Sequence, residues 1–386
     1  MKLLRRIVLW VGIGLMLTAV FSCGAAPVRW YLKEASPWRV LVVDKTVPHP
    51  DYREHKALFW VLRHDKVGNP TGERGWPLNR DYIGFSPDPD DTQSHGTWED
   101  LSPGHLANAN MLYLADSYGV YRGDYESERP NMAGLDYSAL IYGGLKDHEV
   151  DAVEEFGARG GHIVAEFNTF ASPTSGEARA RLQNLFGLDW SGWTGRYFRD
   201  LSEESEVPLW AYRNWKEHYG LDWELEGPGY LLVHEDTRLF VLRLGREIDA
   251  PGLTIERRDG GRITEDVTHG LRFNYWFDIV SARPQASVPA DFHLAVNEAG
   301  RETLQRFGVP DTFPAVVVAS EAPLRAYFAG DFSDSIGTLG PHWAEGVPWL
   351  NQRIVGLWFP SGADQEPFYW GFYIPLLRGL LSRVSP

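Results

Sequence analysis

The chain has 386 residues and a formal net charge of −15, because 52 acidic residues outnumber 37 basic ones. A surface this acidic repels a phosphate backbone, so we exclude nucleic acid as a partner. With 44% hydrophobic and 23% charged residues, the composition is that of a globular protein rather than a disordered or collagen-like one. Cys23 is the single cysteine, which excludes a disulfide framework, a cysteine-based zinc cluster and a cysteine nucleophile in the globular part.

The amino terminus, residues 1–28, has the pattern of a segment that attaches a protein to a membrane. The basic residues Lys2, Arg5 and Arg6 precede Ile7–Val28, a run of 22 residues without a charge. At about 1.5 Å per residue, a helix of this length would span the roughly 30 Å hydrocarbon core of a bilayer. Because the basic residues precede the run, we expect them to stay in the cytoplasm and the rest to face outward, in a bacterial cell envelope.

Two modes of attachment stay open. The residues Val20–Cys23 resemble a lipoprotein signal, in which Cys23 would become the lipidated first residue. Trp30 and Tyr31 instead favour an uncleaved anchor, because they fall where the aromatic belt of a membrane interface belongs. A cleaved signal peptide fits less well, since the small residues before Pro27 make a poor cleavage site. In both open modes the partner is membrane lipid.

Short apolar runs in the first half of the chain predict the strands of a buried sheet. The four predicted strands are Trp38–Asp44, Met111–Asp116, Ala139–Tyr142 and His162–Phe167. A helix is predicted over Arg53–Leu62, and a second begins at Asp147 and ends at Gly160-Gly161. Because the second helix stands between the third and fourth strands, we expect a βαβ unit with parallel strands.

The pattern of apolar and polar residues changes near Val207, after a predicted helix over Glu177–Phe186. Short apolar runs then alternate with turns, and the residues Arg258–Gly261 predict a hairpin. Phe313–Ala319 and Ala326–Ala329 are predicted strands that rejoin the sheet, and Tyr369–Val384 is a predicted closing helix. The expected fold class is therefore α/β, with a layered and mostly parallel sheet. The expected units are an α/β domain over residues 38–206, a β-rich inserted or appended section over 207–312, and completing elements over 313–386.

Polar residues follow the predicted strands at the points where the strands end. In an open parallel sheet, ligands bind outside the carboxyl ends of the strands. We therefore predict one ligand-binding crevice, formed by Asp44, Lys45, Asp116, Glu166, Asn168 and Asp331. Each isolated aspartate has an alternative use as the cap of a turn or helix, which is the commoner one.

Glu166 interrupts an apolar run, so it needs a partner or a ligand. Lys45 is its predicted partner, and an ion pair would explain both residues without catalysis. The pair Asp331 and Asp334 is a weak metal signal, and we predict neither a metal nor a cofactor. We expect Glu54-His55 and His64-Asp65 to be solvated.

Aromatic clusters invite a carbohydrate interpretation, because aromatic faces stack on sugars while polar groups fix their orientation. The clusters are Trp190–Phe198, Tyr275–Asp278 and Phe368–Tyr373. The alternative, favoured for most individual rings, is that they fill the core. Within the first cluster, Arg196 has a guanidinium suited to a carboxylate or carbonyl-rich ligand. We expect Arg196 and Tyr197 to close one side of the crevice.

The segment Ala139–Phe170 (ALIYGGLKDHEVDAVEEFGARGGHIVAEFNTF) resembles the core of class I glutamine amidotransferase-like domains, whose relatives include the trehalose-utilisation family and the trimerisation domain of some β-galactosidases. Those domains share a strand, a helix ending in Gly-Gly and a return strand within a flavodoxin-like sheet. The resemblance implies this fold and a crevice at the strand ends. Amidotransferases also need a cysteine nucleophile, so the chain is expected to lack glutaminase activity. The segments Val42–Leu62 and Asn79–Phe85 resemble uncharacterised membrane-anchored bacterial envelope proteins.

Three functions are compatible with this pattern. The first is an envelope protein whose amidotransferase-like crevice binds a saccharide or a protein partner. The second is a glycan hydrolase that uses the carboxylates of Glu166 and Asp116 as its acid and base. The third is a structural subunit of a polysaccharide-export assembly. Fold alone does not decide between them.

Overall fold

The computed structural model describes residues 24–125, 138–203, 206–258, 260–335, 337, 339–358 and 365–383. Most of the predicted attachment segment, Cys23 included, lies outside these residues. Within the described ranges, no helix combines the length and the apolar composition needed to cross a bilayer. Residues 24–32 form a short helix that precedes the first strand.

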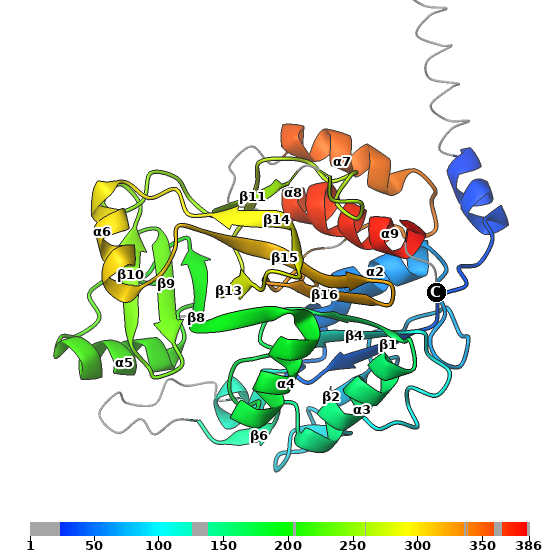
Figure 1. The fold of residues 1–386 in the computed structure, drawn as a ribbon, viewed down its shortest axis with the longest axis horizontal. Coiled ribbons are helices and arrows are strands. Elements are labelled where there is room, and N and C mark those ends of the chain that lie inside the picture. The colour runs from blue at the N-terminus through cyan, green and yellow to red at the C-terminus, as the bar shows by residue number, and fades with distance from the viewer. Residues whose placement is uncertain are drawn as a thin grey trace, which may run out of the picture.

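A ten-stranded sheet runs through the molecule in the order β12-β11-β14-β15-β16-β7-β4-β1-β2-β3 (Figure 1). Its central five strands are parallel to one another. They are β16 (Leu324–Phe328), β7 (His162–Ala165), β4 (Met111–Asp116), β1 (Val40–Asp44) and β2 (Ile83–Pro87). β3 (Gly96–Trp98) adds antiparallel to β2 at one edge. The predicted α/β class is confirmed, but the sheet is mixed rather than mostly parallel, since its other described pairings are antiparallel.

Helices cover both faces of the parallel strands, as buried parallel strands require (Figure 1). One face carries α2 (Lys56–His64), which continues a 3₁₀ turn at Arg53–His55, and α9 (Ile374–Arg383). The other face carries α3 (Asp147–Ala158) and α4 (Gly176–Phe186). Ser175 caps α4, since its hydroxyl accepts a bond from the backbone of Ala178. The parallel order of these strands places their carboxyl ends at one edge of the sheet.

The other half of the sheet is antiparallel. Its strands are β15 (Thr312–Glu321), β14 (Ser287–His293), β11 (Leu253–Arg257) and β12 (Leu271–Phe273). A second, four-stranded antiparallel sheet has the order β10-β9-β8-β13. Its strands are β8 (Leu188–Phe198), β9 (Gly229–His234), β10 (Leu239–Arg243) and β13 (Phe277–Ala282). The remaining helical segments are α5 (Leu209–Tyr219), α6 (Glu298–Phe307), α7 (Val347–Trp358), α8 (Glu366–Phe368) and a π-helical turn at Tyr369–Tyr373.

The predicted βαβ unit is wrong in its first strand. Residues Leu140–Tyr142 form β6, which pairs antiparallel with β5 (Val120–Tyr121) in a separate two-stranded sheet beside the 3₁₀ turn at Arg122–Tyr125. Leu140 is exposed, whereas every residue of β4 is buried. The chain leaves the main sheet at the end of β4 and returns through α3 to β7. β4 and β7 are neighbours in this sheet and are parallel. A short apolar run does not by itself distinguish a core strand from a peripheral one.

Two features of the section after Val207 also differ from expectation. The section begins with a helix, α5, rather than a strand. Arg258–Gly261 does not close a tight hairpin, because β11 ends at Arg257 and its antiparallel partner β12 begins only at Leu271. The strands of residues 207–312 belong to both sheets, and the proposed unit boundaries at 206 and 312 stay a prediction.

Lys45 and Glu149 form a buried ion pair between the end of β1 and the first turn of α3. Their charged atoms lie 2.6 Å apart, and neither side chain is exposed. Glu149 also accepts bonds from the backbone nitrogens of Lys146 and Leu101, so it caps α3 and fixes a neighbouring loop. The predicted pair between Lys45 and Glu166 is therefore wrong. Adjacent residues of a strand point to opposite faces, and Lys45 points toward α3.

The first prediction concerns this pair. Glu149→Gln should destabilise the fold by about 3–5 kcal/mol, because it leaves the Lys45 ammonium buried beside a neutral amide. The free energy of unfolding in urea measures the effect. Glu155→Gln, at an exposed position of the same helix, is the matched control and should change stability by no more than about 0.5 kcal/mol. Equal effects in the two variants would contradict the assignment.

Candidate functional site

Four aspartates gather at the carboxyl edge of the parallel strands. Asp44 ends β1 and lies beside Asp116, which ends β4. Asp331 and Asp334 follow β16 in the sequence. Each of the four is at least nine-tenths buried. We call Asp44, Asp116, Asp331 and Asp334 the carboxyl-edge cluster.

The carboxylates of the cluster are close enough to act on one another electrostatically. Burial raises the pKa of Asp116 well above its usual value, and the carboxylate of Asp44 raises it further. Burial likewise raises the pKa of Asp331, with added repulsion from Asp334, Asp116 and Glu166. The sequence-based expectation that strand-end acids meet at one edge therefore holds for these residues.

Two members of the cluster have well-defined protein partners. Asp44 lies 2.7 Å from Nδ1 of His55, whose Nε2 lies 2.9 Å from the carbonyl oxygen of Leu78. Only a doubly protonated ring donates at both nitrogens, so this arrangement suits a cationic His55 that balances Asp44. Asp334 pairs with Arg53, whose Nε is 2.8 Å from its carboxylate.

The carboxylate of Asp331 makes no hydrogen bond or close ion pair with a described residue, and the charge of Arg53 offsets the effect of burial on its pKa only in part. It is only 7% exposed. A buried carboxylate without a partner is costly, so proteins seldom retain one without a function. Asp331 is therefore the member of the cluster best placed to contact a ligand.

Glu166 is placed at the same edge, but its oxygens are already satisfied. One accepts a bond from the hydroxyl of Tyr113. The other accepts bonds from the backbone nitrogens of Phe332 and Ser333, each at 2.9 Å, and from the Ser333 hydroxyl at 3.0 Å. Burial raises the pKa of Glu166 to about 7 despite these donors. Glu166 thus ties the end of β7 to the loop after β16, which suits a structural role better than a catalytic one.

Arg53, Glu54 and Tyr275 surround the cluster. The Arg53 guanidinium donates to the hydroxyl of Tyr275 at 3.0 Å. Oε2 of Glu54 is buried without a hydrogen-bond partner. Burial raises the pKa of Glu54 well above its usual value, with further repulsion from Asp44 and Asp334. The expectation that Glu54 and His55 are solvated is wrong, because the 3₁₀ turn before α2 directs both inward.

Arg196 extends from β8 toward this region. Its guanidinium lies over the rings of Phe198, Tyr275 and Trp276, at 4.7, 5.8 and 5.9 Å. It forms an exposed ion pair with Glu206 at 3.0 Å, while its Nε is buried without a partner. Burial lowers the pKa of Arg196, and the carboxylate of Asp334 acts in the opposite direction.

Tyr197 does not lie beside Arg196 at this site. It is buried in the main core, and its ring meets that of Tyr230 edge to face at 5.3 Å. The prediction that both residues close one side of a crevice is therefore wrong for Tyr197. Consecutive residues of a β-strand point to opposite faces of the sheet, so the side chains of Arg196 and Tyr197 cannot lie on the same face.

Asn168 serves mainly as a junction. It has a left-handed backbone, with φ of 64°. Its nitrogen donates to Asp278 of β13 at 3.2 Å, and its carbonyl accepts from Ser117 after β4 at 3.1 Å. Asp278 is also bonded to Tyr327 and Thr194, and burial raises its pKa to about 6. These contacts join the two sheets next to the cluster.

A second acidic group surrounds Lys45. Asp100, His148 and Glu149 offer ligand atoms that all lie within 4.8 Å of one another, a spacing that a metal ion accepts. The Lys45 ammonium lies 2.6 Å from Glu149 and 3.9 Å from Asp100. Lys146 pairs with Asp100 at 2.7 Å. The lysine charges therefore already fill the role that a cation would have there.

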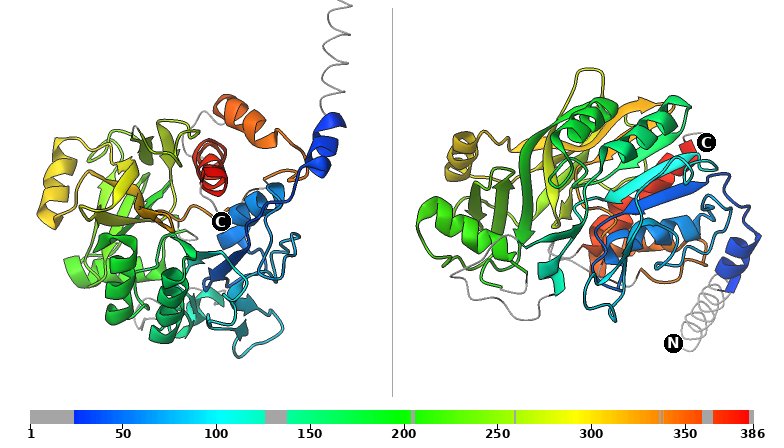
Figure 2. Two further views of the ribbon diagram at one scale, coloured as in Figure 1. Left: turned by 45° about the vertical axis from the view of Figure 1, so that its right-hand side comes forward. Right: turned by 90° about the horizontal axis from the view of Figure 1, so that it is seen from below.

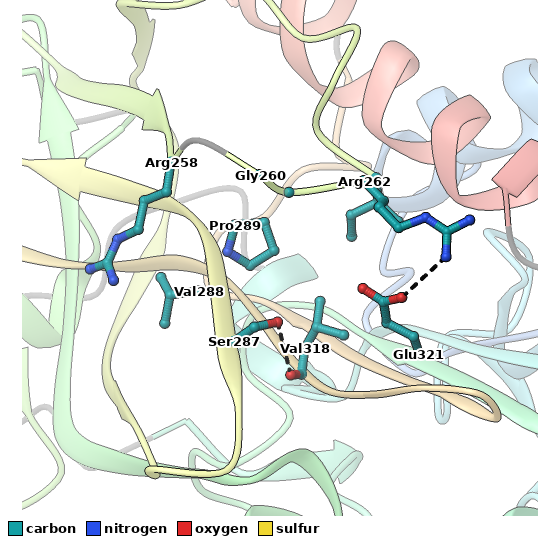
Figure 3. A pocket seen from close by; sticks show the side chains of 10 residues that line it. Arg258, Gly260, Arg262, Ser287, Val288, Pro289, Val318 and Glu321 are labelled. Atoms are coloured by element: carbon teal, nitrogen blue, oxygen red, sulfur yellow. Dashed lines mark hydrogen bonds and ion pairs between the residues drawn. The ribbon is translucent and has the colours of Figure 1, made fainter.

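A hollow of about 170 Å³ lies elsewhere, between the residues after β11 and the strands β14 and β15 (Figure 3). Its charged residues have protein partners. Arg258 pairs with Asp291, which it contacts at 2.8 Å through Nη2, and Arg262 lies 3.6 Å from Glu321. None of the predicted site residues lines this hollow.

Sequence reasoning missed several residues of the site. Arg53, Glu54 and His55 stand on a helical segment far from any predicted strand end, and Tyr113 is inside a strand. Their inward orientation depends on tertiary packing. The one usable signal was the placement of Glu54-His55 directly before the apolar helix Lys56–His64, since residues that begin a buried helix often face the interior.

No protein-family model matches the chain, and no curated protein matches it. Among solved structures, it is similar to a ThuA-like protein from Bacteroides uniformis, with 10% identity over 83% of this chain and 94% of that one, and a TM-score of 0.35. A ThuA-like protein from Parabacteroides merdae gives 10% identity over 86% and 90%, with a TM-score of 0.36. Likeness at this level carries no argument about function, and membership of the amidotransferase-like family stays a prediction.

The second prediction concerns Glu166 and pH. Its pKa is raised in the folded state, to about 7 from an ordinary value of 4.5. Between pH 4.5 and about pH 7, Glu166 therefore keeps its proton in the folded protein but has released it in the unfolded chain. The contribution of this residue to the free energy of unfolding falls as the pH rises through this range. Glu166→Gln removes the titration and retains an acceptor for the backbone donors. The variant should gain about 3 kcal/mol relative to wild type between pH 5 and pH 8.

Urea unfolding of both proteins across this pH range measures the difference. The Glu155→Gln variant is again the control, because its exposed carboxyl should give a constant difference from wild type. If the difference in the free energy of unfolding between Glu166→Gln and wild type does not change with pH, the raised pKa of Glu166 is contradicted.

Proposed function

We propose that this protein is a membrane-attached, extracytoplasmic component of a bacterial cell envelope that binds a saccharide at the carboxyl-edge cluster, without glutaminase activity. The observation that carries the proposal is the buried and unpartnered carboxylate of Asp331, surrounded by other acids. A ligand that donates hydrogen bonds without adding negative charge would compensate it. Sugar hydroxyls have this property.

The surroundings of Asp331 support a sugar rather than a simple cation. Its backbone nitrogen donates to the carbonyl of Trp276 at 2.9 Å, so the partly buried rings of Tyr275 and Trp276 are close by. Arg53 and Arg196 lie beside Tyr275, at 5.6 and 5.8 Å from its ring. Aromatic faces next to carboxylate and guanidinium groups form the usual combination for recognising a polyhydroxylated ring.

A glycan hydrolase is the second candidate, and the gathering of buried carboxyls at one edge of the sheet favours it. A hydrolase needs one carboxyl that stays protonated as an acid and a second that acts as base or nucleophile. The occupied oxygens of Glu166 make it a poor choice for either role. We therefore assign the acid and base roles of this alternative to Asp331 and Asp116.

The third prediction separates the two candidates. Asp331→Asn should weaken binding of neutral envelope oligosaccharides by roughly tenfold or more, because one of the two carboxyl oxygens that accept from sugar hydroxyls is replaced by an amide NH₂ group. Isothermal titration against saccharides first selected on a glycan array measures it. Asp311→Asn, at an exposed position, is the control and should bind as wild type does.

If wild type releases reducing ends from the same glycans and Asp331→Asn or Asp116→Asn does not, the hydrolase is favoured. Wild-type affinity in Asp331→Asn would contradict both candidates.

The fourth prediction tests membrane attachment. Deletion of residues 1–28 should move the protein from the membrane pellet to the soluble fraction, because it removes the uncharged run. A truncated protein that still pellets with membranes would contradict the proposal. Cys23→Ala distinguishes the two modes. It would abolish lipoprotein processing but would leave a spanning helix in place.

A further inference from the structure

Large exposed hydrophobic side chains are concentrated on one part of the surface. Ten such side chains occur among the described residues, and six of them belong to two short segments. Val28, Tyr31 and Leu32 belong to the helix over residues 24–32, and Trp343, Trp349 and Leu350 belong to the start of α7 and the loop before it. Tyr31 is 78% exposed and Trp349 59%. We call these six residues the aromatic face.

The two segments are in direct contact, so their exposed residues belong to one surface. The backbone nitrogen of Glu345 donates to the carbonyl of Ala26 at 3.1 Å. The rings of Trp30 and His342 meet edge to face at 5.7 Å, and Lys33 lies 3.7 Å from Glu345. In Figure 1 and in the left view of Figure 2, the chain that leads into α7 passes next to the helix over 24–32.

Positive charge accompanies this face on a protein whose net charge is −15. Arg29 and Arg353 are exposed, and the Arg353 guanidinium lies 5.1 Å from the ring of Trp349. Lys66 lies 4.9 Å from the ring of Trp30. Glu34 is the exposed acid nearby in sequence, while Glu345 is compensated by Lys33. Aromatic and basic side chains together are typical of surfaces at the headgroup level of a bilayer.

We propose that the aromatic face rests on the membrane surface, with Tyr31, Trp343 and Trp349 in the headgroup region. This inference rests on the proposed membrane attachment. The uncharged run that begins at Ile7 ends at Val28, within the helix over 24–32. A segment held in the bilayer therefore brings the aromatic face to its surface. Tethering makes even a weak surface contact effective, because the second contact becomes intramolecular. The face thus fixes how the globular part is oriented over the lipid.

Photo-crosslinking of the full chain in vesicles tests this orientation. The vesicles contain phosphatidylethanolamine, phosphatidylglycerol and a phospholipid with a diazirine close to its headgroup. After illumination, mass spectrometry locates the lipid adducts. We expect adducts on peptides that contain Trp343 and Trp349. The internal controls are Trp98 and Leu221, which are 47% and 61% exposed but outside the face, and these should stay unlabelled.

A variant sharpens the test. Trp349→Ser should lower the adduct yield on its own peptide by roughly tenfold, since it removes the apolar surface that holds the segment in the interface. Labelling of peptides that contain Tyr31 should persist. Because Trp349 is exposed, the variant should fold, and urea unfolding checks this. Adducts on residues 343–350 no more frequent than on Trp98 would overturn the inference.

The outcomes separate the inference from the proposed attachment. A chain that stays in the vesicles without labelling of residues 343–350 contradicts only the orientation. A chain that does not associate with the vesicles contradicts both the attachment and the orientation.

Discussion

The stability of the fold depends on how several buried carboxylates at one edge of the parallel strands are compensated. Parallel strands place all their carboxyl ends together, and an acidic residue ends or follows each of the five here. In a buried setting each ionised carboxylate needs a counter-charge or donors. Asp44 has His55, Asp334 has Arg53, and Glu166 has Tyr113 and the loop after β16. Asp331 has no hydrogen-bonded partner among the described residues, and the charge of Arg53 offsets its burial only in part.

This uneven distribution is the basis for separating structural from functional acids. A carboxylate whose lone pairs all accept protein donors has little capacity left for a ligand, and Glu166 is of this kind. Lys45 with Glu149 is another closed arrangement, on the opposite face of the sheet. Both oxygens of Asp331 are free to accept hydrogen bonds, and the removal of this carboxylate from water destabilises the ligand-free protein. A bound ligand that supplied donors would offset this destabilisation, which is why we place the saccharide there.

Much of the fold could be predicted because its signals are local. The strands β1 and β4 are apolar runs that end in aspartate, β7 is a short buried strand that Glu166 follows, and α3 has a capped start and a glycine soon after its end. The convergence of Asp44, Asp116 and Asp331 followed from the parallel order of the strands alone. β6 was misplaced because three apolar residues carry no information about which sheet they join.

The errors in the site have a common physical origin, which is the direction of side chains. Lys45 and Tyr197 each follow a site residue by one position, so the pleat of the strand turns them to the other face. Glu54 looked solvated because its neighbours in sequence are polar, and only the packing of α2 against the sheet makes it buried. Such facts depend on tertiary contacts that no short sequence pattern contains.

The most direct test of this account compares the stabilities of Asp331→Asn and Asp334→Asn by urea unfolding at pH 7 without ligand. Asp334 is paired with Arg53, so its replacement should lower the free energy of unfolding. Asp331 is unpaired, so its replacement should leave that energy unchanged or raise it, as expected for a group kept for a ligand. If Asp331→Asn destabilises the protein as much as Asp334→Asn does, Asp331 is part of the structural network and the central claim fails.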